Sequence, residues 1–287
     1  MMLSRSLLFV PADKEKMLYK INQLKADGVI LDLEDAVAND NKSLARELIK
    51  QYIIDMNTSV FIRVNSIETS DFKKDMELIK SISHLENLQG IVLAKSNSEQ
   101  CILQLNDYLN KYENYDFKNN KIKIIPLIED ALGVYNIDEI IKASDRIARV
   151  AFGAEDFTED IGAEKTPKQE ELLFAKSKLI LSSRVHKIEK PIDTVYTDFT
   201  DITGFKESVL HSKRLGFGGR LLIHPNQVEV ANEYFAPSIE EVTLAKEIIK
   251  HAKKNKGAFN LNGKMIDKPI ITRAENTIKQ YNLIHTI

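Results

Sequence analysis

An apolar run passes directly into a cluster of acids in the stretch Gly28-Val29-Ile30-Leu31-Asp32-Leu33-Glu34-Asp35. The run has the length and the branched aliphatic composition of a strand that is buried on both faces. Its end carries three carboxylates within four positions, those of Asp32, Glu34 and Asp35. A single acid there would fit the cap of a following helix, whereas three acids favour a functional site at the end of the strand.

Seven further apolar runs of similar length alternate with longer amphipathic segments. The runs lie at residues 6–10, 60–64, 90–94, 123–127, 147–151, 192–196 and 220–223. Between them we predict helices at residues 15–24, 72–82, 99–109, 134–141, 170–186 and 205–215. Eight strands that alternate with helices predict an α/β fold with a parallel sheet, and eight strands close a (β/α)₈ TIM barrel. The alternative is an open doubly wound sheet, but no GxGxxG motif follows the first strand.

The residues after the eighth strand depart from this alternation. After the eighth strand we predict one helix at residues 226–234 and another at 240–254, which Ser238 would cap together with Glu241. Gly257 then breaks the helical pattern. We therefore predict a TIM barrel catalytic domain over residues 1–236, followed by a C-terminal helical extension with a lid arm over residues 237–287.

The composition excludes several classes of protein. A net charge of −2 and dispersed lysines do not indicate a nucleic-acid partner, and the absence of tryptophan leaves few platforms for base stacking. The apolar stretch at residues 7–10 is too short for a signal peptide, and no segment approaches the ~20 apolar residues that span a bilayer. The single cysteine, Cys101, excludes an internal disulfide and a cysteine-based zinc site. We expect a cytoplasmic protein with no membrane partner.

Arg63 lies inside the apolar run at residues 60–64. A charge inside such a strand must be paired or must face a cavity. At the carboxyl end of a strand, a guanidinium can hold a substrate carboxylate through two parallel hydrogen bonds. The alternative is a structural ion pair with the acids at residues 32–35.

Two further acidic motifs, at residues 126–130 and 153–156, follow the predicted fifth and sixth strands and contain Glu129 and Asp156. Active sites of TIM barrels lie at the carboxyl ends of the strands, so these two acids would come from adjacent strand ends. An all-oxygen site suits Mg²⁺, which binds few protein carboxylates and keeps positions for water and substrate. Helix capping would explain either motif alone, but the combination favours a metal site.

Seven motifs resemble the family of the citrate lyase beta subunit, and they occur in the order of that family. They are RSLLFVP at residues 5–11, LDLEDAV at 31–37, RVN at 63–65, PLIE at 126–129, GAED at 153–156, IHPNQ at 223–227 and GKMID at 263–267. The resemblance extends from Arg5 to about Ile278. This family of the HpcH/HpaI aldolase superfamily includes malyl-CoA and citramalyl-CoA lyases.

The resemblance implies a carbon–carbon lyase that uses Mg²⁺, or Mn²⁺ as a substitute. Glu129 and Asp156 would be the metal ligands, and Asp267 would be a catalytic acid that in many members enters the site of a neighbouring subunit. The other implied roles are catalysis by Arg63 and Glu34, substrate binding by Arg63, Asp32, Asp35, Lys95, Ala154 and Glu155, and thioester-carrier binding by Arg5, Phe9 and Lys14.

Three positions depart from the pattern of the family. Many members have glycine where this chain has Ala12, proline where it has Ala94, and arginine where it has Lys176. Lys95, which follows Ala94, is retained. We expect these changes at the rim that binds the carrier, so they leave the exact substrate open.

The substrate that the resemblance implies is a 3-hydroxyacyl thioester such as a malyl, citramalyl or citryl thioester, cleaved to a 2-oxoacid and acetyl thioester. Its carrier would be coenzyme A or an acyl carrier protein. The expected assembly is a homotrimer or hexamer, with the other chains of a citrate lyase complex as further partners. The alternatives are a malate-synthase-like condensing enzyme, a thioesterase, or a non-catalytic subunit. The complete set of acids argues against the last.

Overall fold

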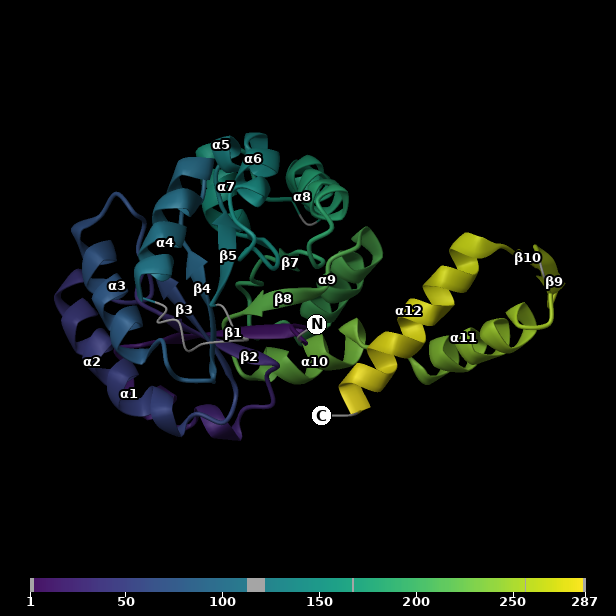
Figure 1. The fold of residues 1–287 in the computed structure, drawn as a ribbon, viewed down its shortest axis with the longest axis horizontal. Helices are drawn as coiled ribbons and strands as arrows, with labels where there is room; N and C mark the ends of the chain where they lie inside the picture. Colours follow the sequence, from purple (N-terminus) through teal and green to yellow (C-terminus); the bar gives the residue numbers. More distant parts are fainter. Residues whose placement is uncertain (1–2, 113–121, 167, 256, 286–287) are drawn as a thin grey trace.

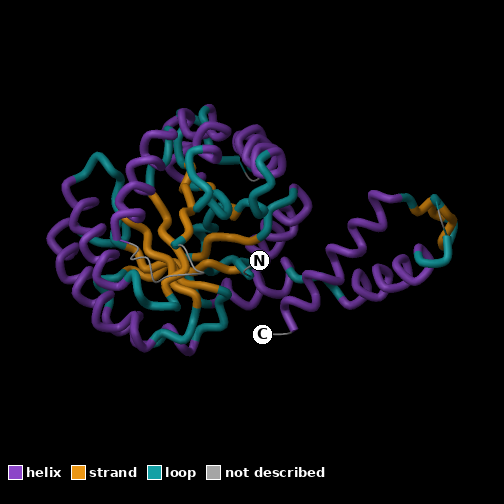
Figure 2. The backbone as a smooth tube through the Cα atoms, viewed as in Figure 1, coloured by secondary structure: helices purple, strands orange, loops and turns teal. Residues whose placement is uncertain are grey.

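The computed structural model describes residues 3–112, 122–166, 168–255 and 257–285, and its centre is a closed barrel of eight parallel strands (Figures 1 and 2). Neighbouring strands pair in sequence order, and the first strand pairs with the eighth. The TIM barrel prediction is therefore confirmed. The strands are β1 (Ser6–Pro11), β2 (Gly28–Asp32), β3 (Ser59–Val64), β4 (Leu88–Leu93), β5 (Lys123–Ile128), β6 (Ala151–Phe152), β7 (Ile192–Asp193) and β8 (Gly219–Leu222).

Helices surround the barrel and cover the outer face of its sheet (Figure 2). The predicted helices are present, but the one predicted at residues 134–141 is divided at Asn136 into two short helices. Two others begin or end in short 3₁₀ turns, at Ile21–Gln23 and Glu170–Leu172. The helices are α1 (Glu15–Tyr19), α2 (Lys42–Tyr52), α3 (Ser70–Ile82), α4 (Glu99–Tyr112), α5 (Ala131–Tyr135), α6 (Ile137–Lys142), α7 (Ala154–Asp160), α8 (Leu173–Val185), α9 (Ile202–Leu215) and α10 (Asn226–Phe235). Of these, α2 and α7 were not predicted from the sequence.

Successive side chains of each strand point alternately into the barrel and out toward the helices. The interior cluster contains Leu7, Ile30, Phe61, Val92, Ile125, Leu127, Ala151, Ile192 and Leu221. The larger outer cluster lies between the strands and the helices. Both faces of the strands are therefore buried, which explains why the strands read as continuous apolar runs.

Two strands are shorter than the apolar runs that predicted them. β6 and β7 have two residues each; both residues of β6 pair with β5, but only Ala151 pairs with β7, through Ile192. Ile147, at the start of the predicted sixth strand, forms an isolated bridge with Ile124 instead.

Beyond the barrel, α11 (Ile239–Ala252) and α12 (Lys268–His285) form an antiparallel arm that projects away from it (Figure 1). A hairpin of β9 (Phe259–Leu261) and β10 (Lys264–Ile266) connects them at the tip. The predicted capping box of Ser238 and Glu241 opens α11. Asn262 and Gly263 both have positive φ values and form the two-residue turn of the hairpin.

The arm has a small core of its own, which contains Ala245, Ile248, Leu261, Ile266 and Ala274. Its base lies beside the amino ends of the barrel strands, where Gln280 of α12 donates a 3.1 Å hydrogen bond to the carbonyl oxygen of Phe235. The tip therefore points away from the carboxyl ends of the strands, and the arm does not form a lid over its own barrel (Figure 1). Within the described ranges, no helix has the length and apolarity to cross a membrane.

Candidate active site

The carboxyl ends of β2 and β3 join the first acidic motif to Arg63. Asp32 ends β2 and lies directly opposite Arg63 in the paired strands. The Nε and Nη2 atoms of Arg63 donate hydrogen bonds of 2.7 and 2.5 Å to the two carboxylate oxygens of Asp32. Nη1 lies 2.9 Å from Oε2 of Glu34. The structural ion pair that the sequence left as an alternative is therefore present.

Asp32 is saturated with hydrogen bonds. Besides the guanidinium, its oxygens accept bonds from the backbone N–H groups of Glu34 and Ala36 at 2.9 and 3.2 Å. It therefore holds Arg63 and the chain after β2 in one arrangement. Asp35 lies at the rim with its side chain 61% exposed, 4.0 Å from Arg63.

Burial alone would lower the pKa of Arg63, but its hydrogen bonds to Asp32 and the charges of Asp32, Glu34 and Glu129 raise that pKa above its ordinary value. Burial also raises the pKa of Glu34 to about 7, against the opposing charge of Arg63. The ring of Phe9 lies beneath the guanidinium, 4.8 Å from its central carbon. Arg63 is thus a fixed cation at the floor of the site.

Glu129 follows β5 and is buried, with 5% of its surface exposed. Its Oε1 accepts a 2.6 Å hydrogen bond from the backbone N–H of Lys95, which has a left-handed φ of 53° at the end of β4. Burial raises the pKa of Glu129 to about 8, although the bond from Lys95 and the charge of Arg63 oppose this effect. The left-handed backbone of Lys95 is a strained conformation for a residue with a side chain, and such strain is common at functional sites.

Gly153 makes room for Glu129. A Cβ atom at position 153 would lie 2.8 Å from Cβ and 2.9 Å from Oε2 of Glu129, so alanine would displace that side chain. Gly153 also begins the turn into α7, whose first turn carries Glu155 and Asp156. The close approach of β5 and β6 therefore brings Glu129 toward Asp156, and the charge of Asp156 contributes to the raised pKa of Glu129.

The residues beside Asp156 form the edge of the site. The backbone N–H of Ala154 donates a 3.0 Å hydrogen bond to Oγ1 of Thr194. Glu155 forms an ion pair with Lys165, which lies on the loop after α7. A hollow of about 370 Å³ lies beside Asp156 and Lys165.

The carboxylates of the site have the composition of a metal-binding site. Four carboxylates, those of Asp32, Glu34, Glu129 and Asp156, act on one another or on the guanidinium of Arg63. These carboxylates carry more negative charge than Arg63 can neutralise, and burial raises the pKa of Glu129. A bound cation would stabilise their ionised form. Over the described part of the chain, no three His, Cys, Asp or Glu side chains converge as a cage. Two carboxylates with open positions fit Mg²⁺, which keeps several waters.

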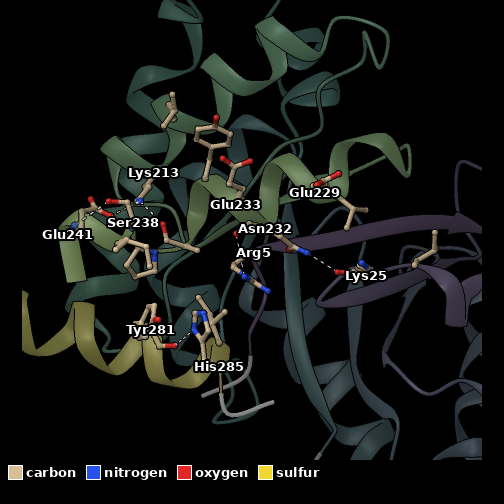
Figure 3. A pocket seen from close by; sticks show the side chains of 18 of the residues that line it. Arg5, Lys25, Lys213, Glu229, Asn232, Glu233, Ser238, Glu241, Tyr281 and His285 are labelled. Atoms are coloured by element: carbon tan, nitrogen blue, oxygen red, sulfur yellow. Dashed lines mark hydrogen bonds and ion pairs between the residues drawn. The ribbon is translucent and has the colours of Figure 1, made fainter. Parts of the chain in front are cut away.

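The predicted carrier-binding residues lie at two different ends of the barrel. Lys14 follows β1 at the carboxyl end, where its Nζ lies 2.8 Å from Asp13. Arg5 precedes β1 at the opposite end, forms a bidentate pair with Asp27, and lines a groove of about 1150 Å³ at the base of the arm (Figure 3). The six residues of β1 separate the two ends by about 20 Å. The structure does not bring Arg5 to the site, and Phe9 faces the barrel interior.

Asp267 lies at the tip of the arm, directly before α12. Its Oδ1 faces the backbone N–H of Ile270 at 3.4 Å, the position of an N-cap. The eighteen residues of α12 place this tip about 27 Å from the base of the arm. Asp267 therefore does not meet Glu129 within one chain.

The three departures from the family pattern do not lie at the rim, which corrects the expectation for them. Ala12 and Ala94 are buried, and Lys176 is 1% exposed with its Nζ 3.0 Å from Asp193. The sequence around Lys176 did not indicate that this lysine would be buried and paired with Asp193.

The contacts of Gly153 and Thr194 were also not predicted from the sequence. Gly153 is part of the GAED motif, but nothing in the sequence pairs Thr194 with Ala154.

Comparison with known proteins places the chain in a family. The family model described as HpcH/HpaI aldolase/citrate lyase matches residues 5–225. The citrate lyase subunit beta of Leuconostoc mesenteroides subsp. cremoris is 32% identical over 294 residues, covering 99% of this chain and 95% of its own. The mitochondrial citramalyl-CoA lyase of Homo sapiens is 32% identical over 293 residues, covering 96% and 84%.

Among solved structures, protein CitE from Mycobacterium tuberculosis in complex with magnesium, acetoacetate and coenzyme A superimposes with a TM-score of 0.79. Its sequence is 26% identical, and the match covers 96% of this chain and 97% of that one. The similarity therefore includes the arm as well as the barrel.

Proposed function

The chain belongs to the HpcH/HpaI aldolase/citrate lyase family, and from this membership we propose that it is a Mg²⁺-dependent carbon–carbon lyase of the cytoplasm. Its substrate is a 3-hydroxyacyl thioester such as citramalyl-CoA, malyl-CoA or a citryl thioester, and its products are a 2-oxoacid and an acetyl thioester. The observation that carries the proposal is the position of Glu129 and Asp156 after adjacent strands, where the charge of Asp156 raises the pKa of Glu129, together with the fixed guanidinium of Arg63.

Glu129 and Asp156 hold the metal in this proposal, and Mn²⁺ can take its place. Bound Mg²⁺ supplies Lewis-acid polarisation of the oxygen on the carbon that becomes a carbonyl. Arg63 stabilises the charge that develops on the 2-oxoacid carboxylate and carbonyl oxygens. Glu34, with its pKa raised to about 7 by burial, is suited to accept the proton of the substrate hydroxyl.

Cleavage leaves a thioester enolate, which needs a proton at the carbon atom. We assign this proton to Asp267 of a neighbouring subunit, because the arm carries Asp267 away from its own barrel. The active site then exists only in an oligomer, and we propose a homotrimer or a hexamer. In this proposal the substrate pocket is lined by Lys95, Ala154, Glu155 and Asp35, and Lys14 contacts the thioester carrier.

Coenzyme A is the proposed carrier, because the solved CitE structure with this fold is a complex with magnesium and coenzyme A. An acyl carrier protein is the alternative, since the curated relatives include citrate lyase beta subunits. In that case the other chains of a citrate lyase complex are partners.

The purified chain alone, assayed with citramalyl-CoA, malyl-CoA and citryl-CoA in the presence of Mg²⁺, tests the proposal. A lyase produces equal amounts of 2-oxoacid and acetyl-CoA and conserves the thioester. Release of free coenzyme A without a 2-oxoacid would identify a thioesterase instead. In a separate reaction supplied with acetyl-CoA and glyoxylate, formation of malate and free coenzyme A would identify a malate-synthase-like condensing enzyme. Absence of turnover with every thioester would support a subunit that needs other chains.

Replacement of Arg63 by lysine is expected to lower kcat/KM by about 10²-fold or more. Lysine keeps the charge but cannot make two parallel bonds to Asp32 and a third contact with Glu34. The measurement is steady-state cleavage, with Arg184→Lys on the exposed face of α8 as the control. Wild-type kinetics for Arg63→Lys would show that only the charge of this residue is needed.

Binding of Mg²⁺ is expected to tighten as the pH rises from about 6 to about 8 and then to level off. Because the pKa of Glu129 is about 8 without metal, Glu129 is mostly protonated at pH 7 and must lose its proton to bind the ion. Calorimetric titration in two buffers of different ionisation enthalpy should record the release of about one proton at pH 7. An affinity that does not change over this range would contradict the role of Glu129.

A further inference from the structure

The amino end of α7, which carries Asp156, is held by a residue from the neighbouring strand. Gly153 occupies the N-cap position and has no side chain that could accept a bond from the first turn. Thr194, directly after β7, takes this role, because its Oγ1 accepts the 3.0 Å hydrogen bond from Ala154. Both partners are buried. Asp156 follows Ala154 by two residues, so this bond fixes the turn that presents its carboxylate.

Thr194 is itself fixed by its neighbour Asp193. The backbone N–H of Thr194 donates a 2.9 Å hydrogen bond to Oδ1 of Asp193. Ile192 faces the barrel interior, so the alternation of the strand turns Asp193 outward, under α8 and α9. There its Oδ2 accepts hydrogen bonds from Lys176 at 3.0 Å and from Ser212.

Two positively charged side chains, Lys176 and Arg220, surround the single carboxylate of Asp193. Lys176 and Arg220 both act on Asp193, with Arg220 Nη1 at 4.0 Å, and all three side chains are almost fully buried. Taking three charges out of water is costly, and an apolar cluster of the same volume is often at least as stable. What the cluster does provide is one fixed orientation for the Asp193 carboxylate, and through it for Thr194.

We infer that Thr194 is a positioning residue for the metal site. Its hydroxyl anchors the amino end of α7 to the residue after β7, so that the turn carrying Asp156 keeps its place beside the end of β5, and the Asp193 cluster holds Thr194 in position. The inference rests on the proposed function, which gives Asp156 its role as a ligand. Groups of this kind, which orient a ligand without touching the metal, typically change metal affinity by 10- to 100-fold when removed.

The test compares Thr194→Val with Thr194→Ser in the full chain. Valine keeps the size and branching of threonine but removes the acceptor, whereas serine retains the hydroxyl. Calorimetric titration without substrate should show Mg²⁺ binding weakened roughly 10- to 100-fold in Thr194→Val and restored to nearly the wild-type value in Thr194→Ser. The thermal midpoint of each protein in EDTA is measured in parallel.

Ser183→Ala is the matched control, because Ser183 is a buried hydroxyl of α8 that donates to the carbonyl oxygen of Leu179 and lies outside the site. It should change the thermal midpoint without changing Mg²⁺ affinity. If Thr194→Val does not fold, Thr194→Ala is titrated instead, with the same expected loss.

Two results separate the inference from the proposed function. If the wild type binds Mg²⁺, Glu129→Gln does not, and the folded Thr194 variant without a hydroxyl binds like the wild type, Thr194 is merely structural and the inference fails. If the wild type does not bind Mg²⁺, or Glu129→Gln binds as tightly as the wild type, the proposed metal site fails, and the inference fails with it.

Discussion

Glu129→Gln is expected to abolish Mg²⁺-dependent cleavage, with a fall of about 10³-fold or more in kcat. Glutamine fits the space beside Gly153 and can still accept the bond from Lys95, so the fold should persist. It cannot supply the negative charge that binds the cation. Asp156→Asn should have the same effect from the other side of the site. Steady-state assays with added Mg²⁺, together with calorimetric titration of the ion, provide the measurement.

Glu139→Gln is the control for this prediction, because Glu139 is a glutamate of α6 that lies outside the site. It should keep wild-type turnover and wild-type affinity for Mg²⁺. EDTA should remove the activity of the wild type, and added Mg²⁺ should restore it. Full activity of the wild type in EDTA would show that the acids at the ends of β5 and β6 do not bind an essential metal.

The barrel could be predicted from the sequence because its strands are buried on both faces and therefore read as apolar runs. The bounds of β6 and β7 could not, since the apolar run of the sixth strand begins before its pairing does, and that of the seventh continues after its pairing stops. The long helix α12 was missed for a related reason: its polar, exposed residues hide the apolar stripe that packs on α11.

The candidate site was predictable in part, for a geometric reason. Acids that directly follow strands of one parallel barrel must meet at one face, so the sequence alone could group Glu129 and Asp156 with Arg63. The same geometry separates Arg5 from Lys14, which are only nine residues apart in the sequence but lie at opposite ends of β1. Contacts between strands that are not acid clusters, such as that of Thr194 with Ala154, leave no periodic signal.

Asp267→Asn is expected to lower turnover by about 10²- to 10⁴-fold while leaving Mg²⁺ binding unchanged. Asparagine caps a helix as well as aspartate does, so α12 should begin at the same residue. An amide cannot exchange the proton that the enolate needs. The substitution therefore separates the capping role, which the structure contains, from the proposed catalytic role. Glu275→Gln, an exposed acid of the same helix, should retain full activity.

Mixing two inactive proteins tests where Asp267 acts. If each site combines Glu129 of one subunit with Asp267 of the next, a hybrid of Asp267→Asn and Glu129→Gln subunits contains some intact sites. Random assembly from equal amounts in a closed ring makes about one site in four complete, so about a quarter of the wild-type activity should return. A fully active monomer would contradict this arrangement. A mixture that stays inactive although labelled subunits exchange would also contradict it. Asp267 would then have to act in the barrel of its own chain, although α12 places it about 27 Å from the base of the arm.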